Sequence, residues 1–238
     1  MKNKIALVTG SAKGMGRNIA IRLASLCSGV AVHYHHSQTE AESAASEIRE
    51  KGALSAAFQA DLTQENQAKG LILEVEKEWG GIGILVNCVG PLMFKKWDEL
   101  EAGDWEFAIK GNLEAAYFCI KAALPGMRER KWGRIINIGY SRAEQLTSFP
   151  NIIPYAVAKT GLLILTRTTA VSEVSSGITV NMVSPGLMEG GALPSGTKIS
   201  PSQLGRFEDV AEAIAFLASD GAYKITGTNL IVAGTWKM

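Results

Sequence analysis

A tyrosine and a lysine stand four residues apart in the stretch Tyr155-Ala156-Val157-Ala158-Lys159. Residues four apart lie on one face of a helix, so a phenol and an ammonium group would face the same site. A neighbouring cation stabilises phenolate and lowers the tyrosine pKa from about 10 toward a value useful for proton transfer. Such a pair also occurs by chance on surface helices, so it indicates a catalytic site only if other motifs of the chain are expected to lie beside it.

A glycine-rich turn is the second feature whose residue types indicate chemistry. An apolar run, predicted to be a strand, leads into Thr9-Gly10-Ser11-Ala12-Lys13-Gly14-Met15-Gly16, and a predicted helix follows at once. Phosphate bound at a helix N-terminus needs backbone N–H groups that face it and no Cβ in the way. Three glycines meet that need, and Gly16 also lets the helix pack close to the sheet. The residues that we assign to this phosphate-binding turn are Gly10, Ser11, Lys13, Gly14, Met15 and Gly16.

The residues after the second predicted strand indicate which dinucleotide would bind. A carboxylate at this point accepts hydrogen bonds from the adenosine ribose and repels a 2′-phosphate. The chain has no acid here before Glu40, and Lys13 adds a cation on the same side. This combination favours NADP(H) over NAD(H). The cofactor-binding residues expected at this end are Tyr34, His35, His36 and Ser37.

All three histidines of the chain stand in this stretch, as His33, His35 and His36. Clustered histidines can bind a metal, but alternate positions on a strand without a nearby third ligand do not favour one. We therefore expect no metal site. We expect instead a partly solvated strand end near the 2′-phosphate.

Short runs rich in Val, Ile and Leu alternate with helical segments along the chain. This alternation predicts right-handed βαβ crossovers and a mainly parallel sheet with helices on both faces. We predict an α/β fold, namely one Rossmann-type doubly wound domain over residues 1–238 with a seven-stranded sheet. The predicted strands are Ile5–Thr9, Val30–Tyr34, Leu54–Gln59, Ile84–Asn87, Arg134–Ile138, Thr179–Ser184 and Leu230–Val232. The predicted helices are Met15–Ser28, Thr39–Lys51, Gln64–Trp79, Asp104–Arg130, Tyr155–Val174 and Glu208–Ser219.

Short polar or glycine-containing motifs follow several of these strands. Open α/β sheets bind ligands at the carboxyl ends of their strands, so the motifs should meet at one edge. The segment 186–205 is rich in Gly and Pro and is expected to be a long mobile loop at the same edge. The residues placed there as cofactor-binding are Asp61, Leu62, Asn87, Val89, Gly90, Pro185 and Gly186.

Taken in order, these motifs resemble the short-chain dehydrogenase/reductase family over essentially the whole chain. They are T-G-x-x-x-G-x-G, D-L, N-x-x-G, an Asn in the next helix, Y-x-x-x-K, P-G and a final I-T-G-x-x-L-x-V. The resemblance implies that Tyr155 is the general acid/base for a carbonyl oxygen, while Lys159 holds the nicotinamide ribose and lowers the tyrosine pKa. It implies that Asn112 anchors a water chain that resupplies the proton. The other matched positions would line the cofactor cleft, from the adenine end: Asp61, Asn87 and Gly90.

One position departs from the family pattern at the end of the fifth predicted strand. The family has a serine there that hydrogen-bonds the substrate oxygen, and the chain reads Asn137-Ile138-Gly139-Tyr140-Ser141. The serine position aligns with Tyr140, and Ser141 follows one step later. We assign Ser141 to the catalytic group. The alternatives are that Tyr140 donates this hydrogen bond, as a phenol can, or that it only fills substrate space.

Charge and composition exclude several classes of protein. The formal net charge of +1 gives no global field for nucleic acid or an anionic membrane, and no apolar run approaches the ~20 residues that cross a bilayer. Three widely spaced cysteines without a C-x-x-C motif indicate reduced core thiols. No signal-peptide pattern precedes the first strand, so we expect a cytoplasmic protein.

The resemblance is closest to 3-oxoacyl-carrier-protein reductases of fatty acid biosynthesis, with a pteridine-reductase-like stretch at residues 33–37. We therefore expect NADP(H)-dependent reduction of a small-molecule ketone, a 3-oxoacyl thioester or a similar carbonyl, free or carried on acyl carrier protein. The alternatives are a pterin-like substrate or a catalytically impaired NADP(H)-binding sensor. A homotetramer or homodimer is expected through the long helices. The expected apolar pocket is Leu92, Met93, Phe94, Phe149, Ile153 and Met188, and the expected basic docking cluster is Arg128, Arg130, Lys131 and Arg134.

Overall fold

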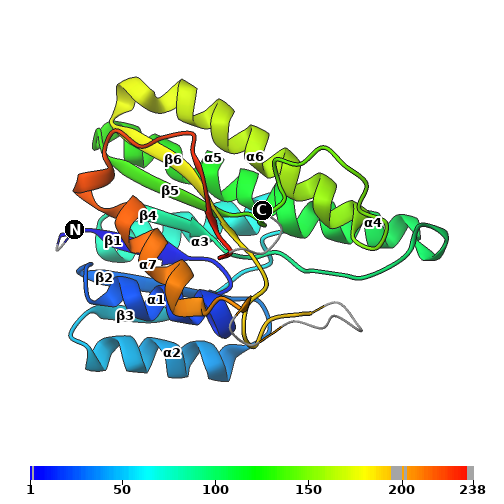
Figure 1. The fold of residues 1–238 in the computed structure, drawn as a ribbon. Coiled ribbons are helices and arrows are strands. Elements are labelled where there is room, and N and C mark those ends of the chain that lie inside the picture. Colours follow the sequence, from blue (N-terminus) through cyan, green and yellow to red (C-terminus); the bar gives the residue numbers. More distant parts are fainter. Residues whose placement is uncertain (2, 194–199, 201–202, 235–238) are drawn as a thin grey trace.

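The computed structural model describes residues 1, 3–193, 200 and 203–234, and within them seven parallel strands form one sheet (Figure 1). The strand order is β3-β2-β1-β4-β5-β6-β7, so the order reverses between β1 and β4. Every neighbouring pair is parallel, which confirms the predicted doubly wound α/β fold. The strands are β1 Ile5–Val8, β2 Gly29–Tyr34, β3 Leu54–Gln59, β4 Ile82–Asn87, β5 Gly133–Ile138, β6 Ile178–Pro185 and β7 Asn229–Val232.

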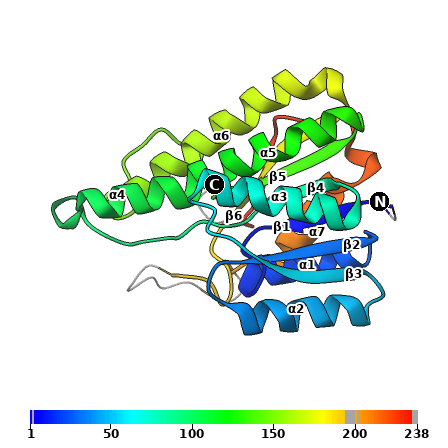
Figure 2. The same cartoon turned by 180° about the vertical axis from the view of Figure 1, so that it is seen from behind.

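Helices cover both faces of the sheet, as the two opposite views show (Figures 1 and 2). On one face lie α1 Gly14–Ala24, α2 Gln38–Glu50 and α7 Phe207–Ala218, with α1 packed between the other two. On the other face lie α3 Glu65–Trp79, α5 Ala115–Glu129 and α6 Ile153–Glu173. The short α4 Ala102–Ile109 packs on α6 and projects beyond the carboxyl ends of the strands.

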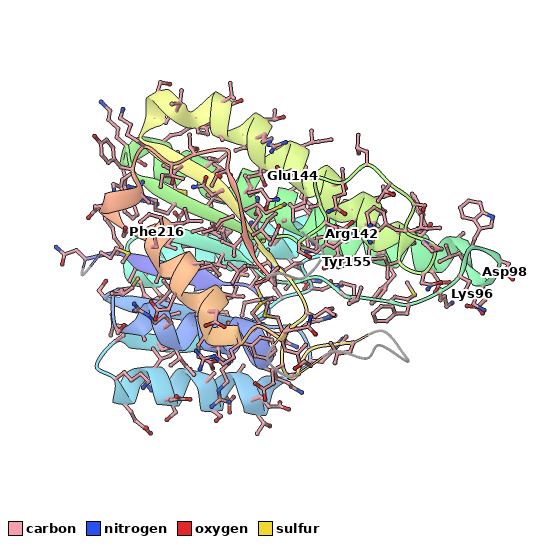
Figure 3. All side chains as sticks on the ribbon, viewed as in Figure 1. Lys96, Asp98, Arg142, Glu144, Tyr155 and Phe216 are labelled. Carbon is pink, nitrogen blue, oxygen red and sulfur yellow. The ribbon has the colours of Figure 1, made fainter. Side chains whose placement is uncertain are left out.

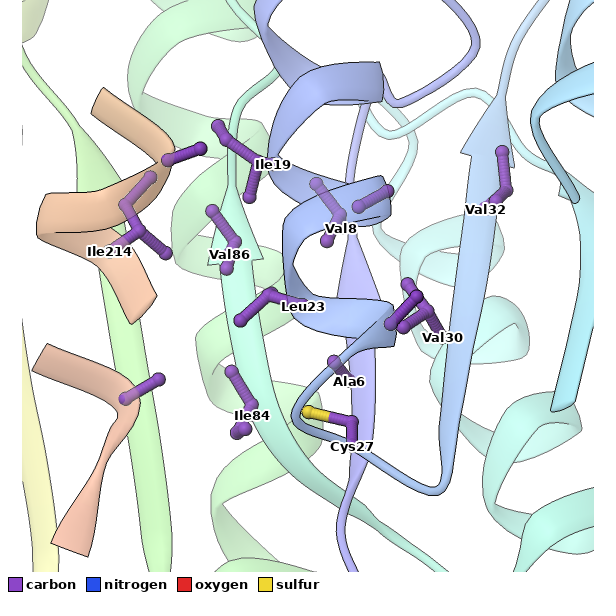
Figure 4. Packing of buried hydrophobic residues seen from close by; sticks show 14 of the residues in the cluster. Ala6, Val8, Ile19, Leu23, Cys27, Val30, Val32, Ile84, Val86 and Ile214 are labelled. Carbon is purple, nitrogen blue, oxygen red and sulfur yellow. The ribbon is translucent and has the colours of Figure 1, made fainter. Parts of the chain in front are cut away.

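The central strands are apolar because both of their faces are covered. Every residue of β2, β4, β5 and β6 is buried, which explains why these strands are rich in Val, Ile and Leu. Beneath α1, the side chains of Ile19 and Leu23 pack against Val8, Val86 and Ile214 (Figure 4). Burying each such side chain contributes about 1.5–3 kcal/mol, so this packing holds α1 and the turn before it against the sheet.

Two predicted helices differ from the observed ones by more than two residues. The first ends at Ala24 rather than Ser28. Ser28 instead donates its backbone N–H to Lys4 O at 3.0 Å, just before the two residues enter β2 and β1. The predicted helix 104–130 is α4 and α5 joined by a π-helical turn, η2 Lys110–Glu114. Single π turns inside helices often occur at functional sites, and this one contains Asn112.

The predicted long loop 186–205 is described only in part, since residues 194–199 and 201–202 lie outside the described residues. The described part is held by backbone hydrogen bonds from Glu189 N to Gly205 O (2.8 Å) and from Gly205 N to Leu187 O (2.9 Å). Among the described residues, no helix has both the length and the apolar character needed to cross a bilayer.

Candidate active site

The glycine-rich turn joins the carboxyl end of β1 to the first residue of α1. Gly10 and Gly14 have φ angles of +66° and +53°, which non-glycine residues rarely adopt. A Cβ on Gly16 would clash with Gly10 O. The turn therefore requires glycine at all three positions, and it leaves open backbone at a helix N-terminus, as phosphate binding demands.

The turn is held from beneath by the end of β4. Thr9 Oγ1 accepts hydrogen bonds from the backbone N–H groups of Cys88 (2.9 Å) and Val89 (3.2 Å). A Cβ on Gly10 would lie 3.1 Å from Val89 Cγ2, so the two strand ends are in close contact. The reversal of strand order falls here, where open α/β sheets bind their ligands.

The end of β2 is partly solvated, as predicted, but His33 itself is buried. Its side chain is 2% exposed, because it turns inward against the glycine-rich turn. Tyr34 is also buried and packs into the core between α1 and α2. His35 and His36 are exposed, with ring centroids 3.6 Å apart, and Ser37 is half-buried. The exposed side chains at this strand end are therefore the second and third histidines.

Charged and polar groups flank this strand end. Lys13 Nζ lies 2.7 Å from Glu40 Oε1, so the first acid after β2 pairs with the cation of the turn at an exposed position. After β3, Asp61 Oδ1 accepts hydrogen bonds from Thr63 N (3.0 Å) and Thr63 Oγ1 (2.7 Å), while Leu62 is buried. Among the described residues, His, Cys, Asp and Glu form no group of three that could hold a metal ion.

Tyr155 (labelled in Figure 3) lies in the first turn of α6. Lys159 follows one turn later, and Pro154 lies at the start of the helix. Proline favours a helix start because its φ is already helical and its missing N–H is not needed there. Lys159 is 3% exposed, and its Nζ donates to Ile138 O at the end of β5 at 2.7 Å. Its Nζ lies 5.6 Å from the ring centroid of Tyr155. The half-buried Tyr155 and the buried Lys159 therefore line the same cavity, as their spacing predicted.

Asn112 reaches the same point from the π-helical turn. Its Nδ2 donates to Pro91 O (2.9 Å) and Ala108 O (3.0 Å), which fixes the amide, and its Oδ1 has no hydrogen-bond partner among the described residues. A Cβ on Gly90 would clash with Asn112 Oδ1 and would lie 3.0 Å from Lys159 Nζ. The structure thus brings Asn112 and Lys159 together at Gly90, leaving an acceptor oxygen beside an ammonium group.

Burial dominates the proton affinities of the pair. It raises the pKa of Tyr155 above its ordinary value and lowers the pKa of Lys159 to about 8. The direction for Tyr155 is opposite to the expectation from its neighbouring cation, because burial removes the phenolate from water and the nearby Tyr140 and Cys88 also raise its pKa. Tyr155 is consequently protonated at neutral pH and suited to donating a proton.

Tyr140 and Ser141 both line the cavity next to Tyr155. The ring of Tyr140 makes edge-to-face contacts with Tyr155 and Phe149, at centroid distances of 5.5 and 5.8 Å. Its Oη is buried without a hydrogen-bond partner among the described residues, and burial raises its pKa to about 12. Ser141 is half-buried, and its backbone N–H donates to Pro185 O at 2.9 Å. Both residues that could replace the family's serine as hydrogen-bond donor, Tyr140 and Ser141, therefore line the cavity.

The cavity above these groups measures about 260 Å³. Of the expected apolar pocket, Leu92, Phe94 and Met188 line it, whereas Phe149 and Ile153 line a neighbouring groove. Met93 lines neither. The remaining walls come from the cofactor-side residues Met15, Cys88, Gly90, Pro185 and Gly186, together with Ile138, Gly139, Ile152, Leu187, Gly191, Ala192 and Phe207.

A buried chain of polar side chains behind the cavity was missed by sequence reasoning. Asn87 Nδ2 donates to Asn137 Oδ1 (2.8 Å), and Asn137 Nδ2 donates to Thr166 Oγ1 (2.9 Å). These two hydrogen bonds link β4, β5 and α6, the helix that carries Lys159. The available signal was one asparagine near the end of each of two buried strands, since a buried amide needs a partner.

The basic cluster proposed for docking an acidic carrier lies at the other edge of the sheet. It covers the end of α5 and the start of β5, at the amino end of that strand. Arg128 pairs with buried Glu173, Arg130 pairs with Glu76 at 3.3 Å, and Arg134 is itself buried. Within one chain, these arginines therefore contact groups of their own fold at the amino ends of the strands, away from the cavity.

Comparison with known proteins agrees with this geometry. A family model described as enoyl-(acyl carrier protein) reductase matches residues 10–235. The 3-oxoacyl-[acyl-carrier-protein] reductase FabG of Staphylococcus aureus is 36% identical over 240 residues, covering 97% of each chain. The acetoacetyl-CoA reductase of Allochromatium vinosum is 34% identical over 243 residues, again with 97% of each covered. The crystal structure of a blue fluorescent protein from a metagenomic library in complex with NADPH superposes with a TM-score of 0.91, at 30% identity and with 100% and 99% coverage.

A parallel sheet with a glycine-rich turn at its reversal point, beside a half-buried tyrosine and a buried lysine, defines a Rossmann-type oxidoreductase fold and site. The chain belongs to the short-chain dehydrogenase/reductase family, as its motifs indicated.

Proposed function

We propose that this protein is an NADP(H)-dependent reductase that converts a ketone, a 3-oxoacyl thioester or a similar carbonyl, to an alcohol. The observation that carries the proposal is the meeting of Tyr155, Lys159 and Asn112 at one buried point beside the cavity. A carbonyl oxygen next to Tyr155 would receive the phenolic proton. The reactions named for the two curated relatives, on 3-oxoacyl and acetoacetyl thioesters, support the same substrate class.

The residues present fit a dinucleotide. The glycine-rich turn is open at Gly14, where a Cβ would meet no atom closer than 4.0 Å, and Asn112 Oδ1 and Asn87 Oδ1 are buried without partners among the described residues. When bound, NADPH would supply the hydride. The residues that would hold it are Gly10, Ser11, Lys13, Gly14, Met15, Gly16, Tyr34, His35, His36, Ser37, Asp61, Leu62, Asn87, Val89, Gly90, Tyr155, Lys159, Pro185 and Gly186.

The preference for a 2′-phosphate rests on His36, Ser37 and Lys13. The Lys13–Glu40 ion pair is exposed, and such pairs contribute about 0–1 kcal/mol to stability. Lys13 could therefore leave Glu40 and form an ion pair with a phosphate dianion instead. No acid stands at the end of β2 itself to repel that phosphate. This arrangement supports NADP(H).

The chain's own residues divide the proton chemistry. Tyr155 holds a proton on its Oη at neutral pH, because burial raises its pKa. Lys159 is fixed by Ile138 O and directs its remaining N–H groups toward the cleft, while Asn112 Oδ1 offers an acceptor for the water that would return the proton. A second hydrogen bond to the substrate oxygen would come from Ser141 or Tyr140.

The proposed reaction is tested by NADPH oxidation, followed at its absorbance, with a panel of 3-oxoacyl thioesters, diketones, sugars and pterins. We expect turnover of 3-oxoacyl thioesters, and a kcat/KM with NADPH at least about tenfold above that with NADH, as one good charge-assisted contact gives. Absence of turnover across the whole panel would refute the proposal.

We also propose that two or four copies associate through the outer face of α6. Val157, Ile164 and Val171 are 46%, 63% and 78% exposed and stand seven residues apart, so they form one apolar stripe. We expect light scattering to show a dimer or tetramer, and Ile164→Glu to shift it toward monomer. Leu73→Glu on α3, which is 53% exposed, is the matched control and should leave assembly unchanged. A wild-type monomer at micromolar concentration would contradict this expectation.

A further inference from the structure

His33 is a buried histidine whose two ring nitrogens are both used. Nδ1 accepts the backbone N–H of Gly10 at 2.9 Å, and Nε2 lies 3.0 Å from Ala60 O. An amide N–H can only donate, so Nδ1 carries no proton and the proton belongs to Nε2, which donates to Ala60 O. The ring is therefore neutral and bridges the glycine-rich turn after β1 to the end of β3.

The backbone of His33 is bound to the same turn. Ser11 N donates to His33 O at 3.0 Å, and His33 N donates to Ser11 Oγ at 3.1 Å. Ser11 Oγ in turn donates to Val8 O at 2.7 Å. One residue of β2 thus holds two successive residues of the turn, by side chain and by backbone.

The Gly10 peptide is the part of the turn that most needs such a fixed position. Gly10 is in the left-handed region, and its carbonyl oxygen is the atom against which Gly16 packs. A shift of this peptide would move the first turn of α1, whose N–H groups face the proposed phosphate site. A turn with three glycines has little stiffness of its own, so an external constraint matters here.

We propose that His33 is a positioning residue for the cofactor, which holds the Gly10 peptide so that the glycine-rich turn is shaped for the pyrophosphate before binding. This inference rests on the proposed dinucleotide binding. His33 itself does not face the cleft, and its effect passes through Gly10.

Two conservative variants separate the two hydrogen bonds. Asparagine can place an amide oxygen near the position of Nδ1, whereas glutamine can place its NH₂ group near the position of Nε2. We expect His33→Asn to keep near-wild-type NADPH affinity, measured by fluorescence titration without substrate. We expect His33→Gln and His33→Leu to bind NADPH about tenfold more weakly, the loss typical of one hydrogen bond and its preorganisation.

The control is Ser55→Ala, which removes another buried link between β2 and β3, from Ser55 Oγ to Val30 O at 2.7 Å. It should lower the thermal midpoint without changing NADPH affinity. Equal affinity of the asparagine and glutamine variants, or unchanged affinity in His33→Leu, would overturn the positioning role while leaving the proposed function intact. A wild-type protein that binds neither NADPH nor NADH would overturn both.

The ring also gives a pH signature that does not depend on activity. Burial lowers the pKa of His33 to about 4, and the titratable groups that interact with it are His35 and Asp61. In the unfolded chain the His33 ring takes up a proton at about pH 6.5, whereas in the folded protein it stays neutral down to about pH 4. The free energy of unfolding therefore falls as the pH drops from about 6.5 toward about 4. Urea unfolding should show this slope in wild type and a shallower one in His33→Asn. Identical slopes would count against a neutral, hydrogen-bonded ring.

Discussion

Replacing Tyr155 with phenylalanine is expected to lower kcat by about 10³-fold, because a general acid in the transition state contributes about 10²–10⁴-fold. The variant keeps the ring that packs against Tyr140 at 5.5 Å and removes only the proton donor. NADPH affinity should change by less than about twofold, since the phenol contributes little to holding the cofactor compared with the glycine-rich turn. The measurement is steady-state NADPH oxidation beside fluorescence titration of NADPH.

Lys159→Met is the companion variant, and it should fail differently. Lys159 is buried and faces the cleft beside Gly90, so its loss should weaken NADPH binding as well as turnover. If Tyr155→Phe and wild type both bind NADPH and turn over no carbonyl, the protein is a nucleotide-binding sensor. Full activity in Tyr155→Phe would remove the proposed acid from the mechanism.

The features that sequence alone could predict were those encoded by local pattern. Strand limits agreed to within two residues because most of the strands are short segments rich in Val, Ile and Leu. The tight turn at Gly10 and Gly14 could be predicted because glycine readily adopts the positive φ angles found there. The meeting of Tyr155 and Lys159 could be predicted because helix geometry places residues four apart on one face.

The features that sequence could not predict depend on partners far along the chain. The sequence did not distinguish the buried His33 from the exposed His35 and His36, because the partners of His33, Gly10 and Ala60, lie 23 and 27 positions away. A helical period cannot reveal the π-helical turn that aims Asn112 at the site. The direction of the Tyr155 pKa shift depends on burial by the whole fold, which a neighbouring lysine in the sequence does not disclose.

Tyr140→Phe is expected to lower kcat/KM by about 10²-fold, the typical effect of losing one donor to a developing oxyanion. Tyr140 Oη is buried beside Tyr155 without a partner among the described residues, and a raised pKa keeps it protonated as a donor. Ser141 is half-buried, one position beyond the family's serine. Ser141→Ala should therefore cost less than about threefold if Tyr140 is the donor.

Stability separates this role from simple packing. An unpartnered buried hydroxyl costs about 1–3 kcal/mol in the ligand-free protein, so Tyr140→Phe should raise the thermal midpoint while it lowers kcat/KM. A residue that only filled substrate space would show the gain in stability without the loss of rate. If Ser141→Ala instead lowered kcat/KM more than Tyr140→Phe, the hydrogen bond to the substrate oxygen would be assigned to Ser141. Its hydroxyl would then have to reach that oxygen when substrate fills the cavity.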